Sequence, residues 1–378
     1  TWTRTDEWYN YKTISPDINV IFNLDESTYE GGENGESHPI AWYHEFEGGR
    51  SFYTGMGHTK ESYADSVYLD HLLQGIQYAL GDNDGLDYSK AKTKRAPEEN
   101  RFTKTVLDFN LDEPTEMSIL PDGKIMFIER KGNVKLYDPA NGKVSVINTI
   151  NAWTKSEDGV IGLTIDPDFE KNKWVYIFYS HPEKSVNVVS RFVFADNKLD
   201  MSSEKEIIEV ATQRETCCHT GGSLLFGPDG NLYISTGDNT SPFASDGFSP
   251  SDETPGPAPF DAQKSSGNTN DLRGKILRIH LEQDGSYTIP EGNLFAKGEP
   301  KTRPEIYVMG CRNPYRISID KKTGYLYWGE VGPDAGQNDS LRGPRGYDEV
   351  NQAKKAGFFG WPYFVGNNYA YAKYDFVA

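Results

Sequence analysis

The clearest fold signal in this chain is Pro228-Asp229-Gly230-Asn231-Leu232-Tyr233-Ile234-Ser235, a turn followed at once by an apolar strand. Similar pairs of turn and strand begin near residues 121, 166 and 322, and the copy at 166 is looser. The longest interval, between the copies at 228 and 322, leaves room for one further copy. All-strand repeats with a period of roughly 40 to 60 residues indicate a β-propeller. The alternative is a β-sandwich in which the Asp-Gly turns recur by chance.

The composition excludes several classes of protein. The chain has 378 residues, with 56 acidic and 39 basic side chains and a formal net charge of −17. A surface this acidic repels phosphate backbones and anionic lipids, which argues against binding to nucleic acids or membrane surfaces. No apolar run approaches the roughly 18 residues that a transmembrane helix needs. Three cysteines are too few for a disulfide-dense scaffold, and no Cys-x-x-Cys-His motif for covalent haem is present.

The composition and the hydrophobic pattern of the sequence divide the chain into three parts. Residues 1–81 have the pattern of a mixed α/β segment, with short apolar strands at 18–23 and 50–54. Residues 82–104 are polar and aperiodic, which predicts a linker. Residues 105–378 carry the strand and turn repeats, so we expect the propeller there.

The first part contains one predicted helix, whose end is expected at Gly81. Ser66 is a candidate cap for its start. Apolar residues at three- and four-residue spacing predict that one face is buried; they are Leu69, Leu72, Leu73 and Ile76.

A histidine and an aspartate flank one predicted hairpin. His219 precedes the strand that runs into the turn at 228–230, and Asp238 ends the returning strand. The two side chains should therefore meet at the same rim. A carboxylate beside an imidazole fixes its tautomer and supports it as a general base. The alternative is a histidine that only satisfies a local hydrogen bond.

Two further stretches carry polar groups suited to ligands. Arg312 and Asn313 precede Pro314 and offer a planar set of donors for carboxylate or carbonyl oxygens; a structural ion pair is the alternative. The segments 329–334 and 346–351 combine glycine with acidic residues. Backbone carbonyls beside carboxylates suit a hard cation such as Ca²⁺, although the spacing fits no EF-hand and a solvated loop is the alternative.

The cysteines leave several pairings open. Cys217 and Cys218 are adjacent, and a disulfide between neighbours is strained and rare. Either of them could instead bridge to Cys311, or all three could remain free thiols.

Taken together, residues 105–378 resemble the soluble glucose/sorbosone dehydrogenases that depend on pyrroloquinoline quinone. The resemblance rests on many short strings that occur in the same order. They are Glu157-Asp158-Gly159-Val160-Ile161-Gly162-Leu163, Asp166-Pro167-Asp168-Phe169, His219-Thr220-Gly221-Gly222, Gly227-Pro228-Asp229-Gly230, Asp271-Leu272-Arg273-Gly274-Lys275-Ile276-Leu277-Arg278, Arg312-Asn313-Pro314, Gly332-Pro333, Asp348-Glu349-Val350-Asn351 and Gly360-Trp361-Pro362.

The resemblance implies a six-bladed propeller with the quinone at one end of its central channel. His219 is similar to the family's catalytic base, which takes the proton of the sugar C1 hydroxyl while hydride passes to the quinone. Asp238 matches the carboxylate that pairs with this histidine. Arg312 and Asn313 match quinone-binding residues, and Glu157 stands where the best-known members carry a glutamine at the quinone site.

The same resemblance implies a calcium ion bound to the quinone. Gly332 and Pro333 match the residues whose backbone carbonyls hold that ion, and Asp348 matches its acidic neighbour. Calcium would polarise the quinone carbonyl as a Lewis acid. The family's closing blades, with further basic quinone contacts, would follow Pro362, so we expect a propeller that is incomplete at its C-terminus.

Residues 1–81 resemble the C-terminal part of a trehalose-utilisation (ThuA-like) domain, whose fold is similar to the class I glutamine amidotransferases. The strings that carry this resemblance are Asp6-Glu7-Trp8-Tyr9, His38-Pro39-Ile40-Ala41-Trp42, Gly49-Arg50-Ser51-Phe52-Tyr53 and Gly57-His58-Thr59. The two domains occur fused in bacterial secreted or envelope proteins. The resemblance therefore implies a periplasmic, cell-surface or secreted protein.

The function that these resemblances imply is oxidation of an aldose at C1 to the lactone. Its partners would be a small sugar and a separate electron acceptor, such as a cytochrome module. One alternative is a non-catalytic propeller that binds carbohydrate or protein. Another is a Ca²⁺-dependent lactone hydrolase, which would need carboxylate and amide ligands from several blades.

Overall fold

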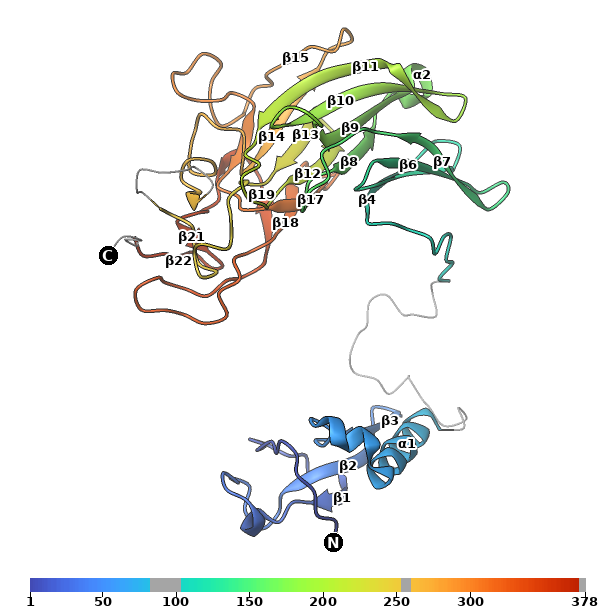
Figure 1. Ribbon diagram of the computed structural model, residues 1–378, viewed down its shortest axis with the longest axis vertical. Coiled ribbons are helices and arrows are strands. Elements are labelled where there is room, and N and C mark those ends of the chain that lie inside the picture. Colours follow the sequence, from blue (N-terminus) through green and yellow to red (C-terminus); the bar gives the residue numbers. More distant parts are fainter. Residues whose placement is uncertain (82–102, 253–259, 374–378) are drawn as a thin grey trace. The chain divides into compact units, whose positions relative to one another are not determined.

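The computed structural model describes residues 1–81, 103–252 and 260–373 (Figure 1). The chain forms two compact units, Thr1–Thr105 and Val106–Ala378. The linker predicted for 82–104 lies outside the described residues except for its last two positions.

The first unit is a mixed α/β segment. Its antiparallel sheet has the order β1 (Asn19–Asn23), β2 (Pro39–Phe46) and β3 (Gly49–Thr54). Helix α1 (Ser66–Leu80) packs against β3. Two short 3-10 helices, η1 (Glu26–Thr28) and η2 (Lys60–Ala64), lie in the connections.

Helix α1 has the predicted extent but a different cap. The side chain of Asp65 accepts a hydrogen bond of 2.9 Å from the backbone N–H of Val67, so Asp65 rather than Ser66 is the N-cap. Gly81 follows the last helical residue, as predicted.

The face of α1 that is buried differs from the predicted one. The buried residues of α1 are Tyr68, His71 and Gly75, whereas Leu69, Leu73 and Ile76 are exposed. Gly75 lies so close to the ring of Phe52 on β3 that a Cβ atom there would come within 2.2 Å of it. The contact between α1 and β3 is therefore made by Gly75 and by the rings of Phe52 and His71. The prediction of a buried leucine face is wrong.

The second unit is mainly β, as predicted. Its first sheet contains β4 (Pro114–Ile119), β5 (Ile125–Glu129), β6 (Asn133–Asp138) and β7 (Lys143–Thr149). The second contains β8 (Val160–Ile165), β9 (Trp174–Ser180), β10 (Val186–Ala195) and β11 (Lys198–Ala211), with α2 (Phe169–Asn172) between β8 and β9. In both sheets each strand pairs antiparallel with the next one in sequence.

Two more sheets follow along the chain. The third has the order β12 (Gly221–Phe226), β13 (Leu232–Thr236), β14 (Lys275–Leu281), β16 (Ile306–Met309) and β20 (Gly357–Phe358), and β15 (Tyr287–Thr288) pairs with β14. The fourth contains β17 (Pro314–Ile319), β18 (Leu326–Glu330) and β19 (Glu349–Ala353). A small hairpin of β21 (Phe364–Val365) and β22 (Tyr369–Ala370) comes last among the described strands.

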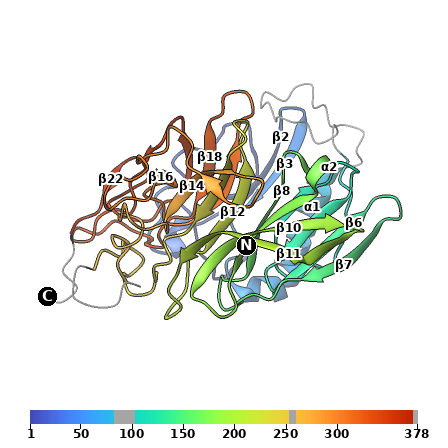
Figure 2. The ribbon, with the colours of Figure 1, turned by 90° about the horizontal axis from the view of Figure 1, so that it is seen from above.

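The hydrophobic cores lie between consecutive sheets. Alternate residues of β9 divide between two of them: Val175 and Ile177 belong to the core shared with the first sheet, and Tyr176 and Phe178 to the core shared with the third. A third core joins the third and fourth sheets. Because side chains alternate across a strand, the second sheet is buried on both faces. Figure 2 shows β6 and β7 of the first sheet beside β10 and β11 of the second.

The first strands of these sheets, β4, β8, β12 and β17, pack beside one another in chain order. This is a propeller-type arrangement of the described sheets, not two sheets stacked face to face. In such antiparallel sheets, the segment that enters the first strand and the segment that leaves the second strand lie at the same end. The loops 150–159, 212–220 and 310–313 enter β8, β12 and β17, and loops beginning at residues 237 and 331 leave β13 and β18. These loops form one rim, which we call the loop rim.

Candidate active site

The structure places His219 and Asp238 together on the loop rim. Gly221 pairs with Thr236 where β12 begins and β13 ends, so the residues just outside that pair face each other. His219 Nδ1 lies 2.6 Å from Asp238 Oδ1. His219 is 4% exposed and Asp238 is fully buried, so water does not compete for this hydrogen bond.

The carboxylate of Asp238 is held by further donors. Oδ1 also accepts the backbone N–H of Thr240 at 3.0 Å, and Oδ2 accepts the indole N–H of Trp361 at 2.7 Å. Because a carboxylate only accepts hydrogen bonds, Nδ1 of His219 carries the hydrogen of the shared bond. In the neutral imidazole Nε2 is then the acceptor, and no described residue hydrogen-bonds to it. This geometry is suited to a general base.

The backbone of His219 is fixed by two contacts. The residue has a left-handed φ of 61°, and its N–H donates a hydrogen bond of 2.6 Å to Glu157 Oε2. A Cβ atom at position 237 would come within 2.0 Å of the His219 carbonyl oxygen, so only glycine fits there. Glu157, which stands at a quinone-site position by resemblance, thus contacts the histidine backbone here.

Arg312 and Asn313 are tied to the same rim. Their backbone N–H groups donate hydrogen bonds of 2.8 and 2.6 Å to Glu330 Oε1. The side-chain oxygen of Asn313 accepts the N–H of Gly221 at 3.0 Å, and the carbonyl of Arg312 accepts the N–H of Asp238 at 2.7 Å. The two predicted constellations therefore form one connected site.

The Arg312 side chain is buried but only partly paired. Nη1 donates to the carbonyl oxygen of Val331 at 3.0 Å, and the guanidinium lies 5.9 Å from the Trp361 ring centroid. The carboxylate paired with it is that of Asp334, 3.8 Å from Nη2 and 73% exposed. This distant partner does not fit the alternative of a close structural ion pair, and it leaves donor capacity for a ligand.

Sequence reasoning missed the role of Glu330. This carboxylate is buried beneath the site, where it accepts the two backbone N–H groups of residues 312 and 313 and the indole N–H of Trp328, the last at 3.0 Å. Burial raises the pKa of Glu330 to about 7. The available signal was an acidic residue at the end of an apolar strand, which we interpreted from the sequence as part of a possible cation-binding segment or of a solvated loop.

The predicted calcium residues lie beside Arg312. Gly332 and Pro333 line a small cavity of about 10 Å³ together with Arg312 and Glu330. The backbone N–H of Gly332 donates to Asp348 Oδ1 at 2.8 Å. Within the described ranges, the carbonyl oxygens of Gly332 and Pro333 accept no hydrogen bond.

The donor set here consists of backbone carbonyls with one carboxylate. The described residues contain no group of three His, Cys, Asp or Glu side chains that could hold a metal ion. Oxygen atoms of this kind are the ligands that Ca²⁺ prefers, and it commonly completes its shell with water or ligand oxygens.

Tyr371 is a second residue that sequence reasoning missed. Its hydroxyl is buried and has no hydrogen-bond partner in the described part of the chain. Its ring packs edge-on against Trp361 at 6.1 Å between centroids. Burial raises the pKa of Tyr371, so the hydroxyl remains a neutral donor. A buried donor without a partner beside a partly paired arginine is typical of a ligand site.

The cysteines near the site form one pair. Cys217 and Cys218, directly before His219, are joined by a disulfide. Cys311 is a buried free thiol whose pKa is raised by burial. The hypothesis of a bridge from either neighbour to Cys311 is therefore wrong.

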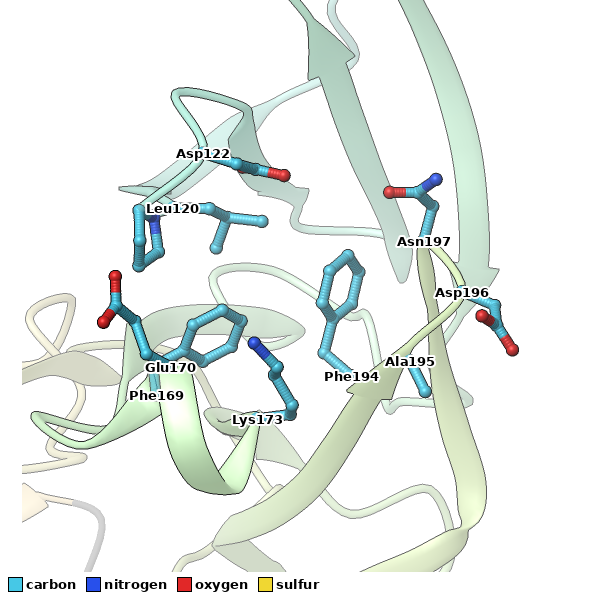
Figure 3. A pocket seen from close by; sticks show the side chains of 10 residues that line it. Leu120, Asp122, Phe169, Glu170, Lys173, Phe194, Ala195, Asp196 and Asn197 are labelled. Atoms are coloured by element: carbon cyan, nitrogen blue, oxygen red, sulfur yellow. The ribbon is translucent and has the colours of Figure 1, made fainter.

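A larger cavity of about 680 Å³ lies between the first and second sheets (Figure 3). Its walls come from the β4–β5 turn, α2 and the β10–β11 turn, with Phe169 and Phe194 among its residues. These connections lie at the end of the sheets opposite the loop rim. None of the predicted site residues lines this cavity.

The part of the chain that the structure describes holds no helix with the length and apolar character needed to cross a membrane.

Comparisons with known proteins match two different family models to two separate parts of the chain. A family model described as Glucose / Sorbosone dehydrogenase matches residues 111–375. A model described as Trehalose utilisation matches residues 1–79.

Two curated relatives carry sugar dehydrogenase names. The chain is 28% identical to quinoprotein glucose dehydrogenase B of Acinetobacter calcoaceticus, over 77% of this chain and 58% of that protein. It is 26% identical to aldose sugar dehydrogenase YliI of Escherichia coli, over 70% of this chain and 63% of that protein. The chain thus spans less than two thirds of the length of these relatives.

The fold is also similar to a solved structure, the PQQ-bound form of aldose sugar dehydrogenase from Streptomyces coelicolor. The TM-score is 0.53 at 22% identity, and the match covers 72% of this chain and 70% of that chain. At this identity the likeness establishes the fold.

Proposed function

Because the chain belongs to the glucose/sorbosone dehydrogenase family, we propose that it oxidises an aldose at C1 to the lactone with pyrroloquinoline quinone as the acceptor. The observation that carries the proposal is the buried His219–Asp238 pair, 2.6 Å apart, in which Nε2 of the histidine is left as an acceptor. The names of two relatives, a quinoprotein glucose dehydrogenase and an aldose sugar dehydrogenase, support the same chemistry.

In this proposal His219 Nε2 removes the proton of the C1 hydroxyl. The C1–H bond breaks at the same carbon and its electron pair leaves with the hydrogen, so C1 becomes the carbonyl carbon of the lactone. Asp238 keeps the imidazole in the required tautomer and stabilises the imidazolium that forms. Pyrroloquinoline quinone, when bound, supplies the two-electron acceptor, and Ca²⁺ bound to it strengthens that acceptor as a Lewis acid.

The residues present fit such a cofactor. Its carboxylates and carbonyls need donors, and the site offers the partly paired guanidinium of Arg312. It also offers the side-chain amide of Asn313 and the hydroxyl of Tyr371, which has no partner among the described residues. The carbonyls of Gly332 and Pro333, with Asp348, would hold the calcium ion. Glu157 would border the quinone site while it holds the His219 backbone.

Several finer expectations belong to the same proposal. We expect the described sheets to be part of a six-bladed propeller. The protein would act in the periplasm, at the cell surface or after secretion, and would pass electrons to a separate acceptor. A purely carbohydrate-binding propeller has no need of a buried, oriented imidazole. A lactone hydrolase would need converging carboxylate ligands, and the described residues do not provide a group of three.

The direct test is a titration of metal-stripped protein with pyrroloquinoline quinone, followed by quinone absorbance with and without Ca²⁺. We expect tight binding that depends on Ca²⁺, and reduction of an artificial dye when aldoses are added. Absence of quinone binding in the full-length protein would contradict the proposal and favour the binding module. Quinone binding without oxidation of any aldose would place the chemistry on another substrate.

A further inference from the structure

Two cations share one aromatic ring on the loop rim. Trp153 and Lys155 lie in the loop that enters β8, and Arg214 lies in the loop that enters β12. The Arg214 guanidinium carbon is 4.7 Å from the centroid of the Trp153 ring, and Lys155 Nζ is 4.9 Å from it. We call these three residues the cationic cluster. The ring holds both basic side chains in place through cation–π contacts.

The cationic cluster is connected to the catalytic pair through both loops. Thr220, next to His219, donates its hydroxyl to Asp158 Oδ1 at 3.2 Å, close in sequence to Lys155. Gln213, next to Arg214, donates its backbone N–H at 2.6 Å to the side chain of Asn239, which follows Asp238. The cluster therefore lies at the edge of the proposed substrate site.

The cations of the cluster form no close ion pair with the described residues, although the Asp158 carboxylate interacts electrostatically with Arg214. Arg214 Nη2 donates to the carbonyl of His181 at 2.5 Å, while its Nε is buried without a partner. Among the residues that the structure describes, no carboxylate oxygen lies within 4.0 Å of a cationic nitrogen of Arg214 or Lys155. This is unusual in a chain with a net charge of −17, where acidic side chains are abundant. An unpaired buried donor in a native structure calls for a missing acceptor.

The neighbouring carboxylates are already engaged with other donors. Glu157 accepts the backbone N–H of His219. Asp158 accepts the hydroxyls of Ser180 and Thr220, and burial raises its pKa. Among the described residues, neither of these carboxylates comes within ion-pair distance of Arg214 or Lys155, so both cations can still bind an anionic ligand.

We propose that Arg214 and Lys155 bind an anionic group, a carboxylate or a phosphate, on the sugar that His219 deprotonates. The inference rests on the proposed function and narrows its substrate to acidic aldoses. A guanidinium presents a planar fork that matches the oxygens of either group, and the lysine adds a point charge. Because the protein as a whole repels anions, local cations are required to hold such a substrate.

The test compares three aldoses on the quinone- and calcium-loaded protein: D-glucuronate, D-glucose 6-phosphate and D-glucose. We expect kcat/KM for at least one anionic sugar to exceed that for glucose by tenfold or more, and the comparison distinguishes carboxylate from phosphate. Arg214→Gln and Lys155→Gln should each lower the anionic-to-neutral ratio at least tenfold, mainly through KM. Lys171→Gln on α2, whose side chain is 81% exposed, is the matched control and should keep the ratio.

The outcomes separate the inference from the proposed function. Oxidation of neutral and anionic aldoses at equal efficiency, with ratios unchanged in both variants, would overturn the inference and leave the dehydrogenase intact. If no aldose is oxidised, the proposed function fails, and calorimetry with glucuronate and glucose 6-phosphate still tests the cluster. If the parent protein binds glucuronate or glucose 6-phosphate and the Arg214→Gln and Lys155→Gln variants do not, the result supports the cluster as an anion site. If the parent protein binds neither compound, the inference is overturned.

Discussion

Trp361 donates its indole N–H to Asp238 Oδ2 over 2.7 Å, although 123 positions separate the two residues. This bond joins the segment after β20 to the carboxylate that orients His219. The same indole lies near Arg312 and Tyr371, so one ring contacts both the proposed proton-transfer pair and the proposed quinone donors. Trp361 is therefore a positioning residue for both halves of the site.

Trp361→Phe should weaken this arrangement without removing the ring. Loss of the indole N–H leaves a buried carboxylate oxygen without its donor, which costs about 1–3 kcal/mol. We expect a lower free energy of unfolding and a several-fold lower kcat, measured by denaturant titration and dye reduction. Trp42→Phe in the first unit is the control. A variant with the kcat of the parent protein would show that this bond does not position Asp238.

His219→Ala should abolish turnover while quinone binding persists. A general base in this position contributes about 100- to 10,000-fold to the rate, and the substitution removes Nε2 without touching the Arg312 side chain. The measurements are steady-state dye reduction and quinone titration on the same preparation. Retained turnover would exclude His219 as the base, and a parallel loss of quinone affinity would make it a cofactor-binding residue instead.

The sequence was sufficient to predict the His219–Asp238 contact because a hairpin is local. One tight turn and two strands of similar length bring the flanking residues together, and the paired positions Gly221 and Thr236 show that they do. The mainly β architecture was predictable for the same reason, since each repeat combines its own turn and strand.

The contacts that escaped prediction are long-range. Trp361 reaches Asp238 because β20, which is distant in sequence, joins the same sheet as β13, and periodicity does not report which distant segments meet. From the sequence alone, Glu330 resembles an exposed loop acid. Only the fold shows that its carboxylate is buried and accepts three N–H groups. Helix α1 shows the same limit: its spacing identifies an apolar stripe, but Gly75 and the ring of Phe52 decide which face is covered.

Arg312→Ala should weaken quinone binding in the calcium-loaded protein. The guanidinium has no close carboxylate partner and lies beside the proposed calcium residues, so its donors are available to an anionic cofactor. We expect the Kd for pyrroloquinoline quinone to rise by tenfold or more, since a charge-assisted hydrogen bond contributes about 1.5–3 kcal/mol. Arg312→Lys should recover part of the loss. Unchanged affinity in the alanine variant would remove Arg312 from the cofactor site.

Lys275 should make stability depend on pH. Its side chain is fully buried and donates to the carbonyls of Ser265, Ser266 and Arg273, and burial lowers its pKa to about 7. The folded protein then binds fewer protons than the unfolded chain between pH 7 and about 10, where an unfolded lysine titrates. Stability from this group therefore rises with pH above 7, by about 1 kcal/mol per unit, and levels off above 10. Lys275→Met should be less stable overall and should lack this rise, which urea unfolding at pH 7, 8 and 9 measures against the parent protein. Parallel pH dependences in the two proteins would show that Lys275 stays charged in the fold.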